Sequence, residues 1–580
     1  MLQYKLNNYF HVSDYDSDYL KHYLEAIGIH QVNSFLDKPT DTDELDPFLL
    51  TNMTEGIRML YGHCHNNSKI FLLVDADPDG YTSASIFYNY IKNKFPYIQI
   101  QYYLHDGKEH GIESLEMIPT DCNLIVIPDA GSNQKEELEA IAARGQSVLI
   151  LDHHESDIEL NNEQIVRINN QLSLGYPNKA LAGAGVVFKF IQAFDTTYGE
   201  GQYWQKYYDL ATLGCISDVM YSGTLENNSI FYKGLNNIHN KFFKALLNKQ
   251  SFSITSTINP NKIDIAFYIT PVINGVIRFG SAEEKNQMFK AMANNDINEK
   301  VEFTSRGEFK VEDYYDHVAR ICVNTKQRQD GAIERATKKI FEEIERSGAQ
   351  NNQIIIYKTS LNDKNDIPKT LTGLIAMKIC AKYNRCALVL RPQIVDGIQY
   401  YMGSGRGKKA EGFESFKDFL NESGLVESAE GHAMAFGATI KEENIEKLIE
   451  YANLILRDTD FGSDVIEVCG VNPPMQALEE FANGIRLYGN GMPQPTFAFK
   501  GLLHKDKCQI MGSHKDTIKF QMGGYNFIKF HAKDFIERLS ENSNPEMIVI
   551  IGKAKNNIWL GTVTTQITID NFEFQKFSLI

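Results

Sequence analysis

Three groups of acidic and histidine residues stand out because each follows a short run of apolar residues. Carboxylates crowded in this way repel one another unless a cation lies between them, and oxygen-rich sites suit Mg²⁺ or Mn²⁺. The sequence therefore points to a site for divalent metal ions. The three groups are Asp75-Ala76-Asp77-Pro78-Asp79-Gly80 after residues 70–74, Asp129 after residues 124–127, and Asp152-His153-His154 after residues 148–151.

The apolar runs predict the strands of a parallel sheet. Runs at residues 69–74, 98–104, 124–127 and 147–151 alternate with segments of helical period at 83–95 and 134–144. Strands this apolar are typical of a sheet covered on both faces. Thr82 or Ser83 is the expected cap of the first helix. Since ligands bind outside the carboxyl ends of parallel strands, we expect the three groups to converge there.

Other interpretations of each group stay open when it is taken alone. Asp75 to Gly80 matches the start of a calcium-binding EF-hand loop, but Ile86 occupies the position that needs a glutamate. The same stretch could be a solvated acidic turn, Asp129 a helix cap, and the two histidines a buried pair. An acidic pocket of the response-regulator type would have no use for the histidines. The occurrence of all three in order favours the metal site.

The ordered set resembles the DHH phosphoesterases, and the resemblance extends over residues 65–580 to the RecJ type of single-strand-specific exonuclease. Residues 169–188 and 210–219 are similar to the segments that follow the DHH motif. Residues 264–280 are similar to a RecJ stretch that supplies a substrate-binding arginine. The tetrapeptide Gly403-Ser404-Gly405-Arg406 and the stretch 431–437 resemble the two signatures of a DHHA1 domain. Residues 488–497 and 512–519 resemble parts of an OB-fold domain.

The resemblance implies catalysis by two divalent ions, Mn²⁺ or Mg²⁺, that activate a water and neutralise the leaving oxygen. His154 would contact the scissile phosphate or the attacking water, and Asp152 would orient the neighbouring histidine. Asp129 would bridge the two ions. The implied ligands are Asp75, Asp77 and Asp129 for one ion, and Asp79, Asp129, His153 and Asp218 for the other.

Substrate contacts are implied in the same way. Arg406 with Ser404 would grip a phosphate by a forked, charge-assisted contact, and His432 would face the metal site. Asn274 and Arg278 match a stretch that supplies a substrate-binding arginine. The sequence departs from the family at Leu73, at Glu430 and around residues 104–106, where a phosphate-binding arginine is missing. The candidates to replace that arginine are His105, Lys108 and His110.

The expected fold class is α/β, with a DHH parallel-sheet domain, a long connecting helix, a DHHA1 α/β domain and a C-terminal OB-like β-barrel. The predicted boundaries are 1–60 for an N-terminal segment of unknown role, 61–310, 311–349, 350–460 and 461–580. In the last region, basic and aromatic residues either bind a strand or form the barrel core. These are Phe497, Phe499, Lys515, Lys519, Phe520 and Trp559.

Composition limits the remaining choices. The 580 residues carry a net charge of −16, which is a weak objection to a nucleic-acid partner, because the local potential of a groove decides binding. The eight cysteines form no CxxC pair, which predicts neither a zinc ribbon nor a disulfide scaffold. No apolar run reaches the roughly 18 residues of a membrane span and no signal segment is evident, so we expect a cytoplasmic protein without a membrane partner.

The leading hypothesis is hydrolysis of single-stranded DNA from the 5′ end, with a role in repair and recombination. RNA and short oligonucleotides are alternative substrates. Cyclic dinucleotides are a further alternative, because related phosphodiesterases resemble the DHH and DHHA1 parts. A catalytically silent scaffold is the alternative outside enzymes. The resemblance also implies a single-strand-binding protein as a partner.

Overall fold

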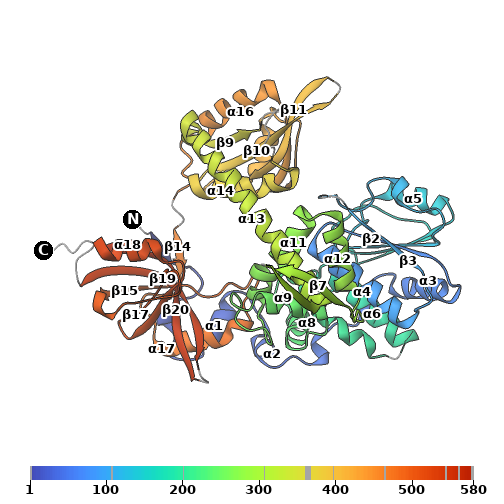
Figure 1. Cartoon of the computed structure of the whole chain (residues 1–580), viewed down its shortest axis with the longest axis horizontal. Helices are drawn as coiled ribbons and strands as arrows, with labels where there is room; N and C mark the ends of the chain where they lie inside the picture. Colours follow the sequence, from blue (N-terminus) through green and yellow to red (C-terminus); the bar gives the residue numbers. More distant parts are fainter. Residues whose placement is uncertain are drawn as a thin grey trace. The chain divides into compact units, whose positions relative to one another are not determined.

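The computed structural model describes residues 3–575 apart from 106, 108, 200, 306, 360–366, 396, 463–464, 542–544 and 560–561. Two compact units make up the chain (Figure 1). One comprises Met1–Ile273, Asn286–Arg320 and Val465–Ile580, and the other Asn274–Lys285 and Ile321–Asp464. Among the described helices, none is both long and apolar enough to cross a membrane.

A five-stranded parallel sheet forms the centre of the first unit, with strand order β3-β2-β4-β5-β6. Alternate residues point to opposite faces. Ile150 packs toward helix α5 on one face, while Leu149 packs toward α3 and α6 on the other. The bounds are β2 Ile70–Val74, β3 Ile100–Leu104, β4 Leu124–Pro128, β5 Ser147–Asp152, β6 Ile165–Asn169, α3 Met53–His65, α5 Lys135–Ala143 and α6 Gly183–Tyr198.

Helix α4, Pro78–Lys94, begins inside the first acidic motif, so the predicted cap at Thr82 or Ser83 was wrong. Asp77 is the cap instead, because its side chain accepts a hydrogen bond from the Gly80 amide at 2.8 Å. Pro78 occupies the first helical position, where its fixed φ and missing N–H are tolerated. Asp79 therefore lies in the first turn of α4, directly beside the sheet edge.

Helix α7, Tyr208–Ser217, packs on α4 and α6, and helix α8, Leu225–Asn236, packs on α7. The unit also contains α9 Lys241–Lys249, α10 Lys262–Asp264 and the hairpin of β7 Lys300–Ser305 and β8 Glu308–Asp313, whereas α12 Ala282–Ala293 is divided between the two units.

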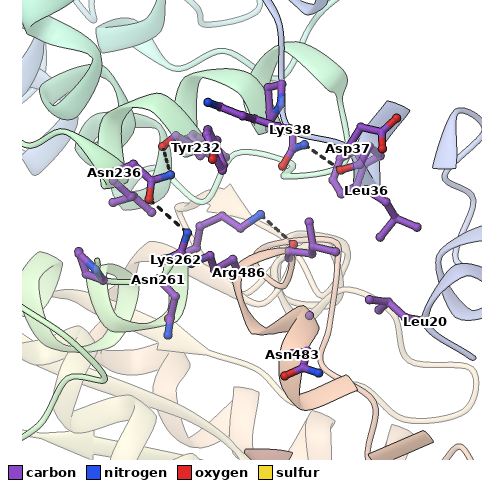
Figure 2. Close-up of a pocket in the computed structure, with 18 residues that line it drawn as sticks. Leu20, Leu36, Asp37, Lys38, Tyr232, Asn236, Asn261, Lys262, Asn483 and Arg486 are labelled. Atoms are coloured by element: carbon purple, nitrogen blue, oxygen red, sulfur yellow. Dashed lines mark hydrogen bonds between the residues drawn. The ribbon is translucent and has the colours of Figure 1, made fainter. Parts of the chain in front are cut away.

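The N-terminal segment, for which no role was predicted, joins the sheet domain to the C-terminal domain. Its strand β1, Tyr4–Leu6, pairs with β14, Ile466–Val468. Tyr23, in helix α1 (Tyr19–Ala26), donates to the Pro493 carbonyl at 2.7 Å. The carbonyl of Leu45 accepts from the buried Lys189 of α6 at 2.6 Å. The stretch after helix α2 (Val32–Leu36) also lines a pocket with α8 and residues 483–487 (Figure 2).

The C-terminal domain is a six-stranded sheet with order β15-β19-β20-β18-β17-β16. Phe497, Phe499 and Phe520 are buried in its core, so they form the barrel interior and are not exposed for stacking on bases. The side chain of Trp559 lies outside the described part. The elements are α17 Met475–Asn483, β15 Phe497–Leu503, β16 Gln509–Met511, β17 Thr517–Met522, β18 Tyr525–Lys529, α18 Lys533–Glu541, β19 Glu546–Trp559 and β20 Thr562–Gln575.

The second unit contains a mixed sheet with order β12-β13-β11-β10-β9. Helix α14 covers one face, and α15 and α16 cover the other. The predicted long helix is α13, Tyr314–Ser347. It begins at residue 314 and not at the predicted 311, because strand β8 extends to Asp313. The other bounds are α11 Thr270–Phe279, β9 Ile354–Lys358, α14 Thr372–Tyr383, β10 Cys386–Val395, β11 Ile398–Arg406, α15 Phe416–Glu422, β12 Ser428–His432, β13 Ala435–Lys441 and α16 Glu442–Ile455.

Candidate metal centre

The predicted metal ligands converge at the carboxyl edge of the parallel sheet. Donor atoms of Asp75, Asp77 and Asp129 lie within 4.8 Å of one another. The same is true of Asp79, His153 and Asp218. Asp129, Asp152, His153 and His154 form a third group of this kind. The structure thus brings the six predicted ligands close together, from the ends of β2, β4 and β5 and the end of α7, while their division between two ions stays a prediction.

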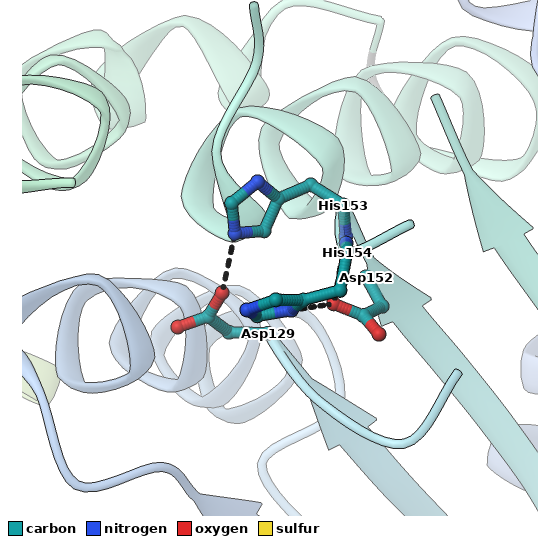
Figure 3. A group of neighbouring side chains, drawn as sticks. All are labelled: Asp129, Asp152, His153 and His154. Carbon is teal, nitrogen blue, oxygen red and sulfur yellow. Dashed lines mark hydrogen bonds and ion pairs between the residues drawn. The ribbon is translucent and has the colours of Figure 1, made fainter. Parts of the chain in front are cut away.

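The ring of His153 points toward the carboxylate of Asp129 (Figure 3). Its Nε2 is 3.2 Å from Oδ1 of Asp129 and 3.5 Å from Oδ2 of Asp218. The nearest oxygen of Asp79 is 4.0 Å away. Burial, and then the charge of His154, lower the pKa of His153 to about 4. The ring is therefore neutral near pH 7, which is the form that ligates metals.

The carboxylates of the centre repel one another strongly. Asp79 and Asp129 are almost fully buried, and burial together with neighbouring carboxylates raises the pKa of each well above its ordinary value. Burial and the charge of Asp77 raise the pKa of Asp218 to about 7. Apart from its 3.2 Å contact with Nε2 of His153, the buried Oδ1 of Asp129 receives no hydrogen bond from the described residues. Divalent cations fit this donor set, because they would offset the repulsion and use that oxygen.

Backbone geometry holds Asp79 and Asp129 close together. The amides of Gly183 and Ala184, at the start of α6, donate to Asp79 at 2.7 and 3.1 Å. A Cβ at Gly183 would lie 2.5 Å from Oδ1 of Asp129, and one at Gly214 would lie 2.4 Å from Oδ1 of Asp79. Asp129 itself adopts a left-handed conformation with φ of 64°. The two glycines therefore permit an approach that no larger residue allows.

Asp152 lies in the same group as Asp129, His153 and His154, and it fixes the ring of His154. Its Oδ1 accepts from Nδ1 of His154 at 2.7 Å (Figure 3). Its Oδ2 accepts from the Ser132 amide at 3.0 Å. Burial lowers the pKa of His154, but the hydrogen bond and charge of Asp152 outweigh it and raise this pKa to about 9. Asp152 therefore favours the protonated form of His154.

Of the three candidates to replace the missing arginine, His110 lies at the centre. Its Nδ1 is 2.7 Å from Oδ2 of Asp75, and its ring is 4.9 Å from that of His154. The prediction for His105 was wrong, because its side chain is fully buried and its Nδ1 lies 2.5 Å from Oε1 of Glu113. Lys108 lies outside the described residues.

Sequence reasoning missed the residues that support Asp218. Val219, the next residue, adopts a φ of 58°, which is strained for a β-branched side chain. The side chain of Asn490, from the segment between α17 and β15 of the C-terminal domain, donates to the Val219 carbonyl. The Ser222 amide donates in turn to the Asn490 carbonyl at 3.0 Å. The C-terminal domain therefore holds the turn that presents a metal ligand.

Three of the predicted substrate contacts share one face of the mixed sheet in the second unit. Arg406 on β11 and His432 on β12 both pair with Ala435 of the strand between them, β13. Ser404 lies two residues before Arg406 on β11 and contacts Thr372 at 2.9 Å. Gly373 leaves room for the Arg406 guanidinium, since a Cβ there would lie 2.7 Å from Nη2.

Asn274 and Arg278 lie one turn apart on α11. Nε of Arg278 donates to Oδ1 of Asn274 at 3.2 Å. Both belong to the second compact unit, as Ser404, Arg406 and His432 do. The structure thus brings the metal ligands and His110 together in the first unit and groups the remaining described substrate candidates in the second.

Comparisons with known proteins cover nearly the whole chain. The family model described as the DHH family N-terminal domain matches residues 69–223, and the RecJ OB domain matches residues 474–571. A protein of the Bacillus subtilis SPbeta prophage, named as the single-strand DNA-specific exonuclease YorK, is 34% identical over 571 residues, 97% of each chain. The single-stranded-DNA-specific exonuclease RecJ of Bacillus subtilis is 25% identical over 558 residues, covering 93% of this chain and 66% of RecJ.

Solved structures share the fold. RecJ from Thermus thermophilus in complex with Mn²⁺ matches with a TM-score of 0.68 and 18% identity, covering 92% of this chain and 74% of that one. The same protein in complex with Mg²⁺ matches with a TM-score of 0.62 and 17% identity, covering 91% and 71%. The likeness extends through both compact units described above.

Proposed function

Because the chain belongs to the RecJ-like family of single-strand DNA-specific exonucleases, we propose that it is a metal-dependent hydrolase that degrades single-stranded DNA from the 5′ end. The observation that carries the proposal is the meeting of seven carboxylate and imidazole side chains at one sheet edge. They are Asp75, Asp77, Asp79, Asp129, His153, His154 and Asp218.

Two divalent ions would be held by the two ligand sets, with Asp129 as the shared residue. When bound, Mn²⁺ or Mg²⁺ would supply activation of a water and charge neutralisation on the leaving oxygen. Mixed histidine and carboxylate ligation makes Mn²⁺ at least as suitable as Mg²⁺.

His154 and Asp152 act as a pair on the substrate. Asp152 orients the ring and keeps it protonated, so Nε2 of His154 is able to donate a hydrogen bond to an oxygen of the scissile phosphate. His110 would add a second donor on the same side, since its ring contacts that of His154. This pair of histidines takes the part that the family gives to arginine around residues 104–106.

The second unit would bind the strand. Arg406 presents a planar cation beside Ser404 on β11, a combination that suits forked recognition of a phosphate. His432 lies in the same cross-strand row and would contact the same stretch of backbone. Asn274 and Arg278 would hold a neighbouring phosphate. The OB-fold domain favours a polymer over a dinucleotide as the substrate.

Digestion of end-labelled strands tests the proposal. Matched DNA and RNA strands of about 40 nucleotides, labelled at the 5′ or the 3′ end, are incubated with the full chain and Mn²⁺ or Mg²⁺. The expected result is early release of the label from 5′-labelled DNA and progressive shortening of 3′-labelled DNA. Cleavage of di- and trinucleotides alone would reject the polymer exonuclease, and no hydrolysis with either metal would favour a scaffold.

A further inference from the structure

A cavity of about 400 Å³ lies between three stretches of the first unit, apart from the metal centre (Figure 2). Its walls come from residues 35–39 with Leu20, from α8 and residues 260–262, and from residues 483–487. The volume falls within the range of sites for small molecules. The cavity thus has the size of a ligand site and is built by the N-terminal segment, the sheet domain and the stretch after α17 of the C-terminal domain together.

A buried lysine forms part of the wall. Lys262 is 2% exposed, and its Nζ donates to the Leu487 carbonyl at 2.7 Å (Figure 2). The Phe231 ring lies 5.6 Å from the same nitrogen. Burial is the cause that lowers the pKa of Lys262, to about 7. Within the described part of the chain, no carboxylate compensates for the burial of this ammonium group. An anion in the cavity would relieve the cost of burying this ammonium group.

The other charged residues of the lining also favour an anion. Lys38 and Arg486 add two cationic side chains, and Asp37 is the one acidic residue among the described residues of the lining. Arg486 is positioned by a hydrogen bond of 3.1 Å from Nη1 to Oδ1 of Asn236. The remaining wall is mostly apolar and partly aromatic, and it includes Phe231 and Leu235 of α8.

We propose that this cavity binds a small organic anion in which a phosphate is attached to a flat ring system, and that its ligand is a nucleoside 5′-monophosphate. The phosphate pairs with Lys262 and Arg486, and the base lies against the apolar wall beside Phe231 and Leu235. The anion site rests on the buried lysine. The choice of a nucleotide rests on the proposed function, because exonuclease action releases nucleoside monophosphates.

Calorimetric titration of the full chain tests this. The four deoxynucleoside 5′-monophosphates and inorganic phosphate are titrated separately in the presence of EDTA, which keeps metal-dependent nucleotide binding at the catalytic centre out of the signal. We expect saturable binding of at least one nucleotide, about tenfold weaker or more in Lys262→Met and in Arg486→Gln, because each loses a charge-assisted contact. Lys447→Met, an exposed lysine of α16, is the matched control and should bind as the unaltered chain does.

A labelling experiment gives a second measurement if Lys262→Met folds poorly. Pyridoxal 5′-phosphate carries a ring, a phosphate and an aldehyde; its aldehyde condenses with a neutral amine with loss of water, and borohydride reduces the imine. Mass spectrometry should find Lys262 among the first lysines modified, with protection by the nucleotide. Lack of nucleotide binding at millimolar concentration, equal affinity for inorganic phosphate, or binding unchanged in both variants would overturn the proposal.

Exonuclease activity separates this site from the proposed function. Lys262→Met and Arg486→Gln should retain Mn²⁺-dependent hydrolysis of single strands while losing nucleotide affinity. A chain that binds nucleotides through Lys262 but hydrolyses no strand would contradict the proposed function and leave the anion site standing. A chain that hydrolyses strands but shows no such binding would contradict only the inference made here.

Discussion

The two sheets that carry the candidate site residues assemble them in different ways. In the parallel sheet of the first unit, the ligands come from the ends of β2, β4 and β5, joined by Asp218 from the end of α7. In the mixed sheet of the second unit, Ser404 and Arg406 lie on one strand and His432 two strands away. One site depends on convergence of distant residues, and the other on a short local pattern.

The electrostatics of the two sites also differ. The first crowds buried carboxylates whose pKa values are raised by burial and mutual repulsion, so it gains stability from a bound cation. The second holds a single guanidinium that hydrogen-bonds the Gly405 carbonyl at 2.7 Å and needs no ion. Substitutions of the metal ligands in the first site should therefore change both metal binding and activity, whereas those in the second site should change only substrate binding.

The largest effect is expected for Asp129→Ala. This substitution removes the residue shared by both ligand sets, so Mn²⁺-dependent hydrolysis of single-stranded DNA should fall about 1000-fold or more. Initial rates on a labelled strand measure it. Asp157→Ala, at an exposed position just after the histidine motif, is the matched control. Substantial residual activity in Asp129→Ala would show that hydrolysis does not depend on this cluster.

The neighbouring histidines should separate binding from catalysis. His154→Ala should lower kcat about 100-fold, because a donor to the phosphate is lost, while stabilisation by Mn²⁺ is retained. His153→Ala should lose both activity and Mn²⁺ stabilisation. Paired kinetic and thermal measurements on the two variants check this. Equal loss of Mn²⁺ stabilisation in both would mean that His154 is also a ligand.

Arg406→Gln tests the second sheet. Loss of the forked cation should raise KM for a single strand about tenfold, with kcat and Mn²⁺ stabilisation nearly unchanged. The control is Arg457→Gln, at an exposed position just after α16 ends. A comparable loss of Mn²⁺ stabilisation in Arg406→Gln would break the distinction between the two sheets.

The smallest effect is expected for Asn490→Ala. Without the hydrogen bond to Val219, the strained turn after Asp218 should relax, and affinity for Mn²⁺ should fall about threefold to tenfold. Adding Val219→Gly should restore most of the affinity, since glycine adopts this φ without strain. Isothermal titration with Mn²⁺ on the single and double variants measures the coupling. If Val219→Gly does not restore the affinity, Asn490 acts through packing alone.

Much of the first sheet could be predicted because apolar strands with polar ends leave a strong local signal. The strands at residues 69–74, 98–104, 124–127 and 147–151 were confirmed with small shifts at their ends. Convergence of Asp79, Asp129 and His153 followed from the rule for parallel sheets. The start of α4 was not predicted correctly, because the Asp77 cap precedes Pro78 and the polar first turn hides the helical period.

Other features left no readable signal. Val219 and Asn490 are far apart in the chain, and neither residue type indicates strain or support of a metal ligand. The N-terminal segment carries no motif, since its role comes from contacts such as Tyr23 with Pro493. The burial of Phe497, Phe499 and Phe520 depends on which face of each strand meets the core, which the composition of the region does not decide.

Thermal unfolding with and without Mn²⁺ tests the central claim that the acidic cluster binds divalent cations. At a hundredfold excess over the dissociation constant, Mn²⁺ should stabilise the unaltered chain by about 2.7 kcal/mol per site. Asp129→Asn should be at least as stable as the unaltered chain in EDTA, because a buried charge is removed, and should gain little from Mn²⁺. Equal stabilisation of both chains by Mn²⁺, or none of either, would contradict the claim.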